Sequence, residues 1–143
     1  MVVLIDTNVI IDFLTTREPY FESSSKVMEK CANGELAGYI SFHSFPNLWY
    51  ILRKVPEEKR RKWLIDICGI LKVVGVNHDE VLRAIKLARF KDFEDCLQDR
   101  CAKNIGAKYI ITRNVADFSE SEVLAISPED FLTITNDAVI EGK

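Results

Sequence analysis

Short apolar runs alternate along the chain with longer stretches in which apolar and polar residues repeat at helical spacing. The first run, VVLI at residues 2–5, is continuous and rich in β-branched residues, as is typical of a strand buried on both faces. Runs of this kind predict four strands, and a fifth near the end, at residues 2–5, 36–41, 71–76, 109–112 and 123–126. The stretches between them predict helices at residues 9–14, 20–32, 44–54, 56–68, 77–90, 92–105 and 127–132.

This order of elements predicts an α/β fold. Strands that alternate with helices form βαβ units, in which the strands are parallel and the helices cover both faces of the sheet. We therefore expect a central parallel sheet of four to five strands. The chain has no internal repeats or linker-like stretches, which predicts one domain over residues 1–134 and a loosely ordered tail over residues 135–143.

Composition and charge are those of an ordinary globular protein. Hydrophobic residues make up 48% of the chain and charged residues 29%, and no stretch approaches the roughly 20 apolar residues of a membrane span. The opening MVVLIDTN meets an aspartate too early for a signal peptide, so we expect a cytoplasmic protein without membrane association. A net charge of −3 argues against coating nucleic acid through bulk electrostatics, and we expect the basic stretch 53–62 to be a solvated helix face.

The four cysteines give little support for a zinc site. None forms a CxxC pair, and the two histidines, His43 and His78, lie far from all of them in the sequence. Cys96 and Cys101 fall among apolar residues of a predicted helix, so we expect reduced, buried thiols.

Polar side chains follow two of the predicted strands and open one helix. Asp6 comes directly after the first strand, and Asn114 and Asp117 follow the strand at residues 109–112. Asp92 and Asp95 open the helix over residues 92–105. In open α/β sheets, ligands bind beyond the carboxyl ends of the strands, so these oxygen-bearing side chains are expected to converge on one rim.

Such a rim suits Mg²⁺ or Mn²⁺, because these hard ions prefer carboxylate and water ligands. A divalent ion lowers the pKa of bound water and stabilises charge on a phosphodiester during cleavage. Taken alone, however, each acid also has a structural explanation. Asp6 can cap a helix, Asp92 and Asp95 have the spacing of a capping box, and Asp117 can be a turn residue. The residues themselves therefore point only to a possible metal-dependent hydrolase.

Three segments, IDTNVIIDFL, DFEDCLQDRCAKNIGAKYIITRN and VADF, resemble the PIN domain family in order and spacing. The ordered pair of Asp6-Thr7-Asn8 with TRN and VADF at residues 112–118 is more specific than any single motif. The resemblance implies a three-layer α/β/α sandwich around the parallel sheet. It also implies a Mg²⁺- or Mn²⁺-dependent ribonuclease site at the carboxyl edge of that sheet.

The resemblance also implies roles for individual residues. Asp6, Asp95 and Asp117 match acids expected to act in catalysis and in metal binding. Asn114 matches a further metal-binding position that is often aspartate. A supporting set is expected beside these ligands, formed by Asn8, Asn47, Asp92 and Thr112.

The chain departs from the family pattern after the second strand. There the family usually has Ser, then five residues, then Glu, whereas here Ser41 is followed at that spacing by Asn47. Asparagine can coordinate through its carbonyl oxygen, but it has no charge and is not a base. The loss of a charged ligand is expected to weaken metal affinity. His43 lies near enough in sequence to compensate, but a lone histidine is better explained as a helix-entry residue.

These observations leave three functional hypotheses. The first is an active metal-dependent endoribonuclease, in a narrower form the toxin of a toxin–antitoxin pair. The second is a PIN-like module that has lost cleavage and binds RNA or a protein. In the third, the acids are only helix caps and the α/β domain has an unrelated role.

The expected partners follow from the resemblance. They are single-stranded or structured RNA, an antitoxin protein, and a second copy of the chain in a homodimer. Four apolar residues are candidates for such a protein interface, although helical spacing favours a place in the core for them. They are Phe13, Leu14, Trp49 and Tyr50.

Overall fold

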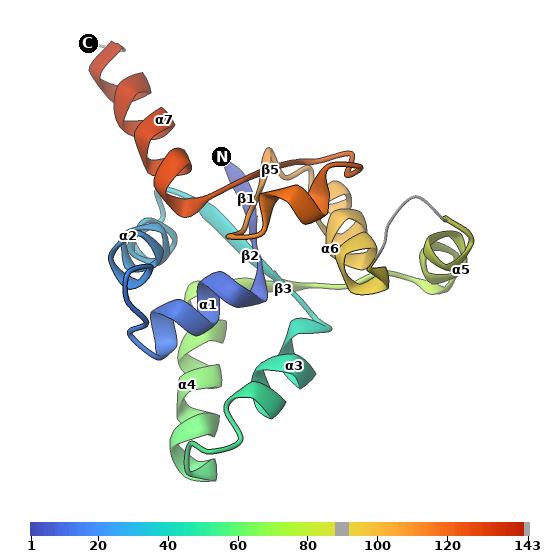
Figure 1. Cartoon of the computed structure of the whole chain (residues 1–143), viewed down its shortest axis with the longest axis horizontal. Helices are drawn as coiled ribbons and strands as arrows, with labels where there is room; N and C mark the ends of the chain where they lie inside the picture. The colour runs from blue at the N-terminus through green and yellow to red at the C-terminus, as the bar shows by residue number, and fades with distance from the viewer. Residues whose placement is uncertain (88–91, 142–143) are drawn as a thin grey trace.

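A parallel sheet of five strands forms the centre of the protein, whose computed structural model describes residues 1–87 and 92–141. The strands lie in the order β3-β2-β1-β4-β5, and all neighbours run parallel (Figure 1). Their bounds are β1 (Val2–Ile5), β2 (Ala37–Ser41), β3 (Lys72–Val74), β4 (Tyr109–Ile111) and β5 (Leu124–Ile126). The predicted parallel sheet is confirmed, with its fifth strand.

Helices cover both faces of the sheet, which gives the expected three layers. The helices are α1 (Thr7–Leu14), α2 (Phe21–Ala32), α3 (Ser44–Ile51), α4 (Glu57–Ile70), α5 (His78–Lys86), α6 (Phe93–Asn104) and α7 (Pro128–Glu141), with a 3₁₀ helix, η1 (Val115–Phe118). In Figure 1, α1, α2 and α4 lie on one side of the sheet, and α5 and α6 lie on the other.

The alternation of side chains along β1 explains its continuous apolar run. Val3 and Ile5 face a core built with α1, α2, α4 and α7, whereas Leu4 faces a second core with Cys101 and Ala102 of α6. All three strand side chains are fully buried. Burial of one such side chain contributes roughly 1.5–3 kcal/mol, so β1 joins the two helix layers and fixes the residue that follows it.

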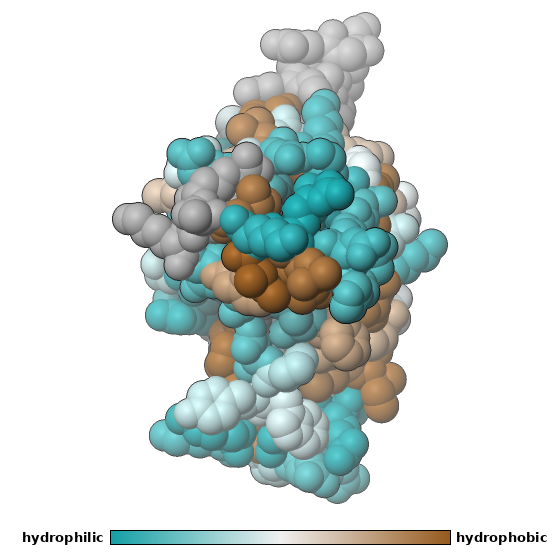
Figure 2. All heavy atoms as spheres, turned by 90° about the vertical axis from the view of Figure 1, so that its right-hand side faces the viewer, coloured by the Kyte–Doolittle hydropathy of each residue, from teal (hydrophilic) through white to brown (hydrophobic). Residues whose placement is uncertain are grey.

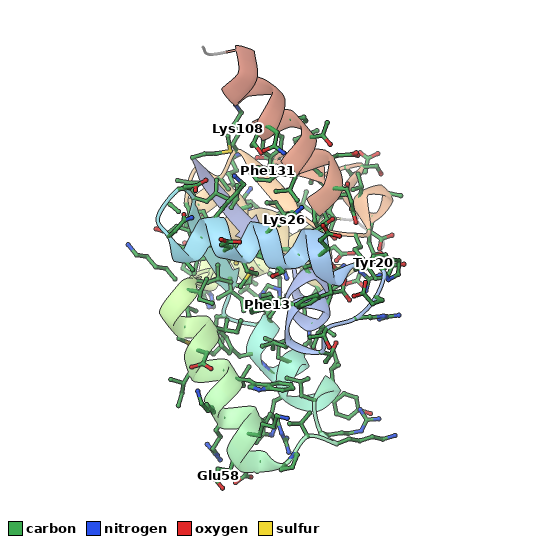
Figure 3. All side chains as sticks on the ribbon, turned by 90° about the vertical axis from the view of Figure 1, so that its left-hand side faces the viewer. Phe13, Tyr20, Lys26, Glu58, Lys108 and Phe131 are labelled. Atoms are coloured by element: carbon green, nitrogen blue, oxygen red, sulfur yellow. The ribbon has the colours of Figure 1, made fainter. Side chains whose placement is uncertain are left out.

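The last helix is longer than predicted. The sequence predicts its end at Leu132, but α7 continues to Glu141, so the expected tail over residues 135–143 begins inside the helix. Phe131 is fully buried and packs edge-on against Tyr109, with ring centroids 5.9 Å apart. Figure 3 shows α7 against α2, with Phe131 near the base of α7. The helix contacts α2 and continues past Thr133, Thr135 and Asn136, which have low helix propensity.

The four apolar residues considered for a protein interface separate into two groups. Phe13 and Leu14 are half-buried and pack against the core, as helical spacing predicts. Tyr50, by contrast, is 65% exposed. Trp49 is half-buried, and the Arg60 guanidinium lies over its ring at 4.1 Å from the centroid. The basic stretch 53–62 is therefore largely exposed. Its first residues lie in the turn before α4, and its helical part also covers a tryptophan.

One further prediction differs from the structure. The helix predicted to run to residue 90 ends at Lys86, and residues 88–90 lie outside the described part of the chain. On the face shown in Figure 2, apolar surface lies among hydrophilic side chains. In α5, Leu82 is 42% exposed and Ile85 is 63% exposed. No helix within the described residues has the length and apolar character needed to cross a bilayer.

At the carboxyl edge of the sheet, the connections between strands and helices lead to opposite sides of the sheet. The chain leaves β1 and β2 through helices on one side, and it reaches β4 from the other side through α6. β1 lies between β2 and β4, so the strand order reverses beside its carboxyl end. This switch point is the usual place for a ligand site in an open parallel sheet.

Candidate active site

Asp6 stands directly after β1 and caps α1. Its backbone N–H donates to the Ile111 carbonyl oxygen at 3.0 Å, which ties it to the end of β4. Asp6 is the N-cap residue, and its side chain accepts from the N–H of Thr7, the first residue of α1, at 2.7 Å. The structural role predicted for Asp6 is therefore real, and it also places the carboxylate at the switch point.

Neutral donors from other elements hold the same carboxylate, which is only 7% exposed. Oδ2 accepts from the Thr112 hydroxyl at 2.8 Å and from the Asn8 amide at 3.3 Å. Oδ1 also accepts from Gln98 Nε2 at 3.3 Å. A helix cap needs only the first-turn N–H, so the additional donors serve to orient the carboxylate.

The turn after β4 is fixed by the same network. Thr112 is fully buried, and its Oγ1 accepts from the Asn114 N–H at 3.0 Å. Asn8 Oδ1 accepts from the Arg113 N–H at 3.2 Å, which joins α1 to this turn. The turn then enters η1, the short helix that carries Asp117.

The start of α6 brings three more acids to this edge. Asp92 is the N-cap, and its Oδ1 accepts from the N–H of Glu94 at 2.8 Å and of Asp95 at 3.3 Å. Glu94 and Asp95 are half-buried, whereas Phe93 beside them is 46% exposed. The first turn of α6 thus presents its acids inward and its phenylalanine outward.

These elements surround a cavity of about 470 Å³ at the carboxyl edge of the sheet. Acidic and amide side chains dominate its wall. They are Asp6, Asn8, Asn47, Asp92, Glu94, Asp95, Asn114 and Asp117, together with Thr7, Ile11, Arg17 and Ile51. Segments far apart in the sequence therefore contribute acids to one cavity.

The acids of this cavity repel one another. Burial raises the pKa of Asp6, and the charge of Asp117 raises it further, against the lowering effect of its hydrogen bonds. Burial, followed by the charges of Asp92, Asp6, Asp117 and Glu94, raises the pKa of Asp95 to about 7. Burial and the charges of Asp6 and Asp92 also raise the pKa of Glu94. Among the described residues, no lysine or arginine forms an ion pair with these carboxylates.

The residues predicted for the site lie together, although their roles stay predictions. All of them line the cavity except Thr112, which is buried and donates to Asp6 from behind. Asn47, at the position where the resemblance expects glutamate, donates from Nδ2 to Glu94 Oε1 at 2.7 Å. His43 is the residue before α3, as expected for a helix-entry position.

Two residues of α6 that were not predicted from the sequence also belong to the site. Glu94 lines the cavity, and Gln98 is fully buried beside Asp6. Gln98 follows Asp95 by three residues and Glu94 by four, so helical spacing puts all three on one face. That spacing is the signal in the sequence that identifies them.

Gln98 links three elements, and its replacement is expected to lower stability. Its Oε1 accepts from the Ser41 hydroxyl at 2.6 Å, and its Nε2 donates to Ser44 Oγ at 3.2 Å and to Asp6. Gln98→Leu keeps the side-chain size but leaves buried polar partners unsatisfied. We expect a loss of about 1–3 kcal/mol in unfolding free energy, measured by urea denaturation. An unchanged midpoint would show that water replaces these bonds.

The donor set of the cavity fits a hard divalent cation. Carboxylate and amide oxygens are the ligands that Mg²⁺ and Mn²⁺ prefer, and a cation relieves the repulsion among the acids of this cavity. Within the described chain, no three His, Cys, Asp or Glu side chains are already gathered as a metal-holding group. Metal binding therefore requires side chains of the cavity wall to turn toward the ion.

The fold and the cavity together define a class of protein, the parallel α/β domain with an acid-lined site at the carboxyl ends of its central strands. The model of the PIN domain family matches residues 2–116. The chain belongs to the PIN domain family.

Comparison with individual proteins agrees with this membership. The chain is 27% identical over 133 residues to Ribonuclease VapC1 of Aquifex aeolicus (strain VF5), covering 90% of this chain and 92% of that protein. Its fold is similar to VapBC2 from Rickettsia felis bound to a promoter DNA fragment, with a TM-score of 0.68, 16% identity, and coverage of 89% and 98%. It is equally similar to VapBC-1 from nontypeable Haemophilus influenzae, with a TM-score of 0.68, 18% identity, and coverage of 90% and 99%.

Proposed function

We propose that the protein is a metal-dependent endoribonuclease that cleaves RNA with Mg²⁺ or Mn²⁺ at the acidic cavity. One observation carries the proposal: in a member of the PIN domain family, acids from three distant segments line one cavity at the switch point of the sheet. The similarity to a protein named as a ribonuclease supports the same activity.

The residues of the cavity have separate tasks in this proposal. Asp6, Asp95 and Asp117 hold the ion, and Asn114 adds an amide oxygen. A bound ion supplies an activated water and stabilises charge on the phosphodiester. Arg17, the arginine on the cavity wall, is available to contact a phosphate of the RNA.

The proposed partners follow from the same comparisons. Structures similar to this chain include VapBC2 and VapBC-1, which supports an antitoxin protein as the partner that controls the nuclease. We further expect the protein to act in the cytoplasm and to form a homodimer. Co-expression with the protein encoded beside it, followed by size-exclusion chromatography, tests the first partner.

The proposed activity is tested by calorimetric titration of Mn²⁺ and Mg²⁺ into the wild type and Asp6→Asn. We expect micromolar-to-millimolar binding by the wild type and none by Asp6→Asn, because asparagine keeps the helix cap and loses the charge. Asp79→Asn, an exposed aspartate in the first turn of α5, is the matched control. We expect the proteins that bind the metal, the wild type and Asp79→Asn, to cleave a labelled RNA, and we expect Asp6→Asn not to cleave it.

The absence of Glu at position 47 keeps one alternative open, a module that binds RNA without cutting it. This alternative predicts that the wild type and Asp6→Asn bind RNA equally well with EDTA present. No metal binding by the wild type at millimolar concentration would contradict the nuclease proposal. RNA binding in EDTA would then favour the module.

A further inference from the structure

Glu94 and Asn47 form a direct contact at the place where the family pattern expects a single glutamate. Asn47 Nδ2 on α3 donates to Glu94 Oε1 on α6 at 2.7 Å, and both residues line the acidic cavity. The partners are 47 positions apart in the sequence. The contact therefore depends on the packing of the two helices around the cavity.

We propose that Glu94 supplies the carboxylate that the chain lacks at position 47, so that α6 instead of α3 delivers this charge to the metal site. Asn47 is a positioning residue that holds Glu94 by hydrogen bond. This inference rests on the proposed function, because it assigns a ligand of the same metal site.

The placement of Glu94 differs from that of an ordinary acid in the first turn of a helix. Such an acid gains from the helix dipole while it stays in water. Here Glu94 is half-buried against other acids, whereas the apolar Phe93 next to it is 46% exposed. The Glu94 carboxylate shares the cavity wall with Asp6, Asp92 and Asp95, and a cation bound among these acids would relieve their mutual repulsion.

The hydrogen bonds at Glu94 leave one oxygen available to an ion. Its backbone N–H is held by Asp92 Oδ1 at 2.8 Å, which fixes the residue at the helix start. Its Oε1 is occupied by Asn47, while within the described residues no donor contacts Oε2. Asn47 uses its N–H in this contact, so its uncharged amide orients a charged ligand.

The test exchanges the carboxylate between the two positions. Mn²⁺ is titrated by calorimetry into the wild type, Glu94→Gln, and the double variant Asn47→Glu/Glu94→Gln, with Glu58→Gln on exposed α4 as the control. We expect Glu94→Gln to weaken Mn²⁺ binding by about 10- to 100-fold and Glu58→Gln to leave it unchanged. The double variant should recover most of the affinity, because it restores a carboxylate from α3. Circular dichroism checks that each variant is folded.

The outcomes separate this inference from the proposed function. If Asp6→Asn abolishes Mn²⁺ binding while Glu94→Gln binds as the wild type does, the metal site stands and the role of Glu94 is overturned. If Glu94→Gln weakens binding and the double variant does not recover it, the exchange between α3 and α6 is overturned. If the wild type does not bind Mn²⁺, both proposals fail together.

Discussion

At pH 8, Asp95→Asn is expected to lower Mn²⁺ affinity by about 100-fold or more and to remove RNA cleavage with it. Asp95 is half-buried in the first turn of α6 and lines the cavity with Asp6 and Asp117. Asparagine has nearly the same size, but it carries no charge and coordinates only through its carbonyl oxygen. Calorimetric titration and a cleavage assay on one preparation measure both losses.

The same substitution is expected to stabilise the metal-free protein. Burial and neighbouring acids raise the pKa of Asp95 from 3.8 to about 7. The folded protein keeps this proton to about pH 7, whereas the unfolded chain releases it near 3.8. The unfolding free energy therefore falls as pH rises from about 4 to about 7. Above pH 7, Asp95→Asn is expected to raise the unfolding free energy by about 1–2 kcal/mol. Solvent screening at this half-exposed group and the loss of its interaction with the helix dipole keep the increase this small.

Thermal unfolding with EDTA or Mn²⁺, at pH 5 and pH 8, separates the two effects. With EDTA at pH 8, Asp95→Asn should melt above the wild type, and the difference should shrink at pH 5. With Mn²⁺ at 100 times its dissociation constant, the wild type gains roughly 2.7 kcal/mol and the order reverses. Asp79→Asn should show the same changes in melting temperature as the wild type under all of these conditions. An equal Mn²⁺-induced shift in Asp95→Asn would show that Asp95 is not a ligand.

The helix and strand framework could be predicted because local patterns specify it. The apolar run of β1 is a signal within a few residues, and the caps Asp6 and Asp92 each lie next to the helix that they begin. The structure has both caps. The end of α7, by contrast, is not specified by a local sequence signal. Beyond Leu132 the helix contains threonine and asparagine, which have weak helix propensity, so the local pattern predicts an earlier end than the structure has.

The candidate site could be predicted only where a residue follows a strand or opens a helix. Topology brings such residues to one edge, as it does for Asp6, Asp95 and Asp117. The parts that the sequence does not reveal are contacts between distant side chains. The bond from Asn47 to Glu94 depends on how α3 and α6 approach each other, and no pattern near either residue records that distance.

The ion pair between Asp12 and Arg113 is another such contact, and breaking it is expected to give the largest loss of stability. Asp12 is fully buried in α1, and its carboxylate accepts from Arg113 Nε at 2.5 Å and from Nη2 at 3.3 Å. The guanidinium also lies over the Tyr20 ring, 4.3 Å from its centroid. Asp12→Ala leaves this arginine without its partner, so we expect a loss of about 3–5 kcal/mol in unfolding free energy.

Urea denaturation measures this loss, and an exposed pair provides the control. Lys62 and Asp66 lie 3.2 Å apart on the surface of α4, and Asp66→Ala is expected to cost less than about 1 kcal/mol. The denaturant slope should be the same in both variants, because neither changes the surface exposed on unfolding. A loss below about 1 kcal/mol in Asp12→Ala would show that water or a rearranged side chain replaces the pair.

The ion pair also connects stability to the site, because Arg113 belongs to the turn that follows β4. Its backbone N–H donates to Asn8, and the next residue, Asn114, lines the cavity. Asp12→Ala should therefore weaken Mn²⁺ binding even at temperatures where the variant stays folded, although Asp12 does not line the cavity. Asp66→Ala should not. If Asp12→Ala loses stability but keeps full Mn²⁺ affinity, the hydrogen bonds of Thr112 and Asn8 suffice to hold the turn, and the ion pair serves the fold alone.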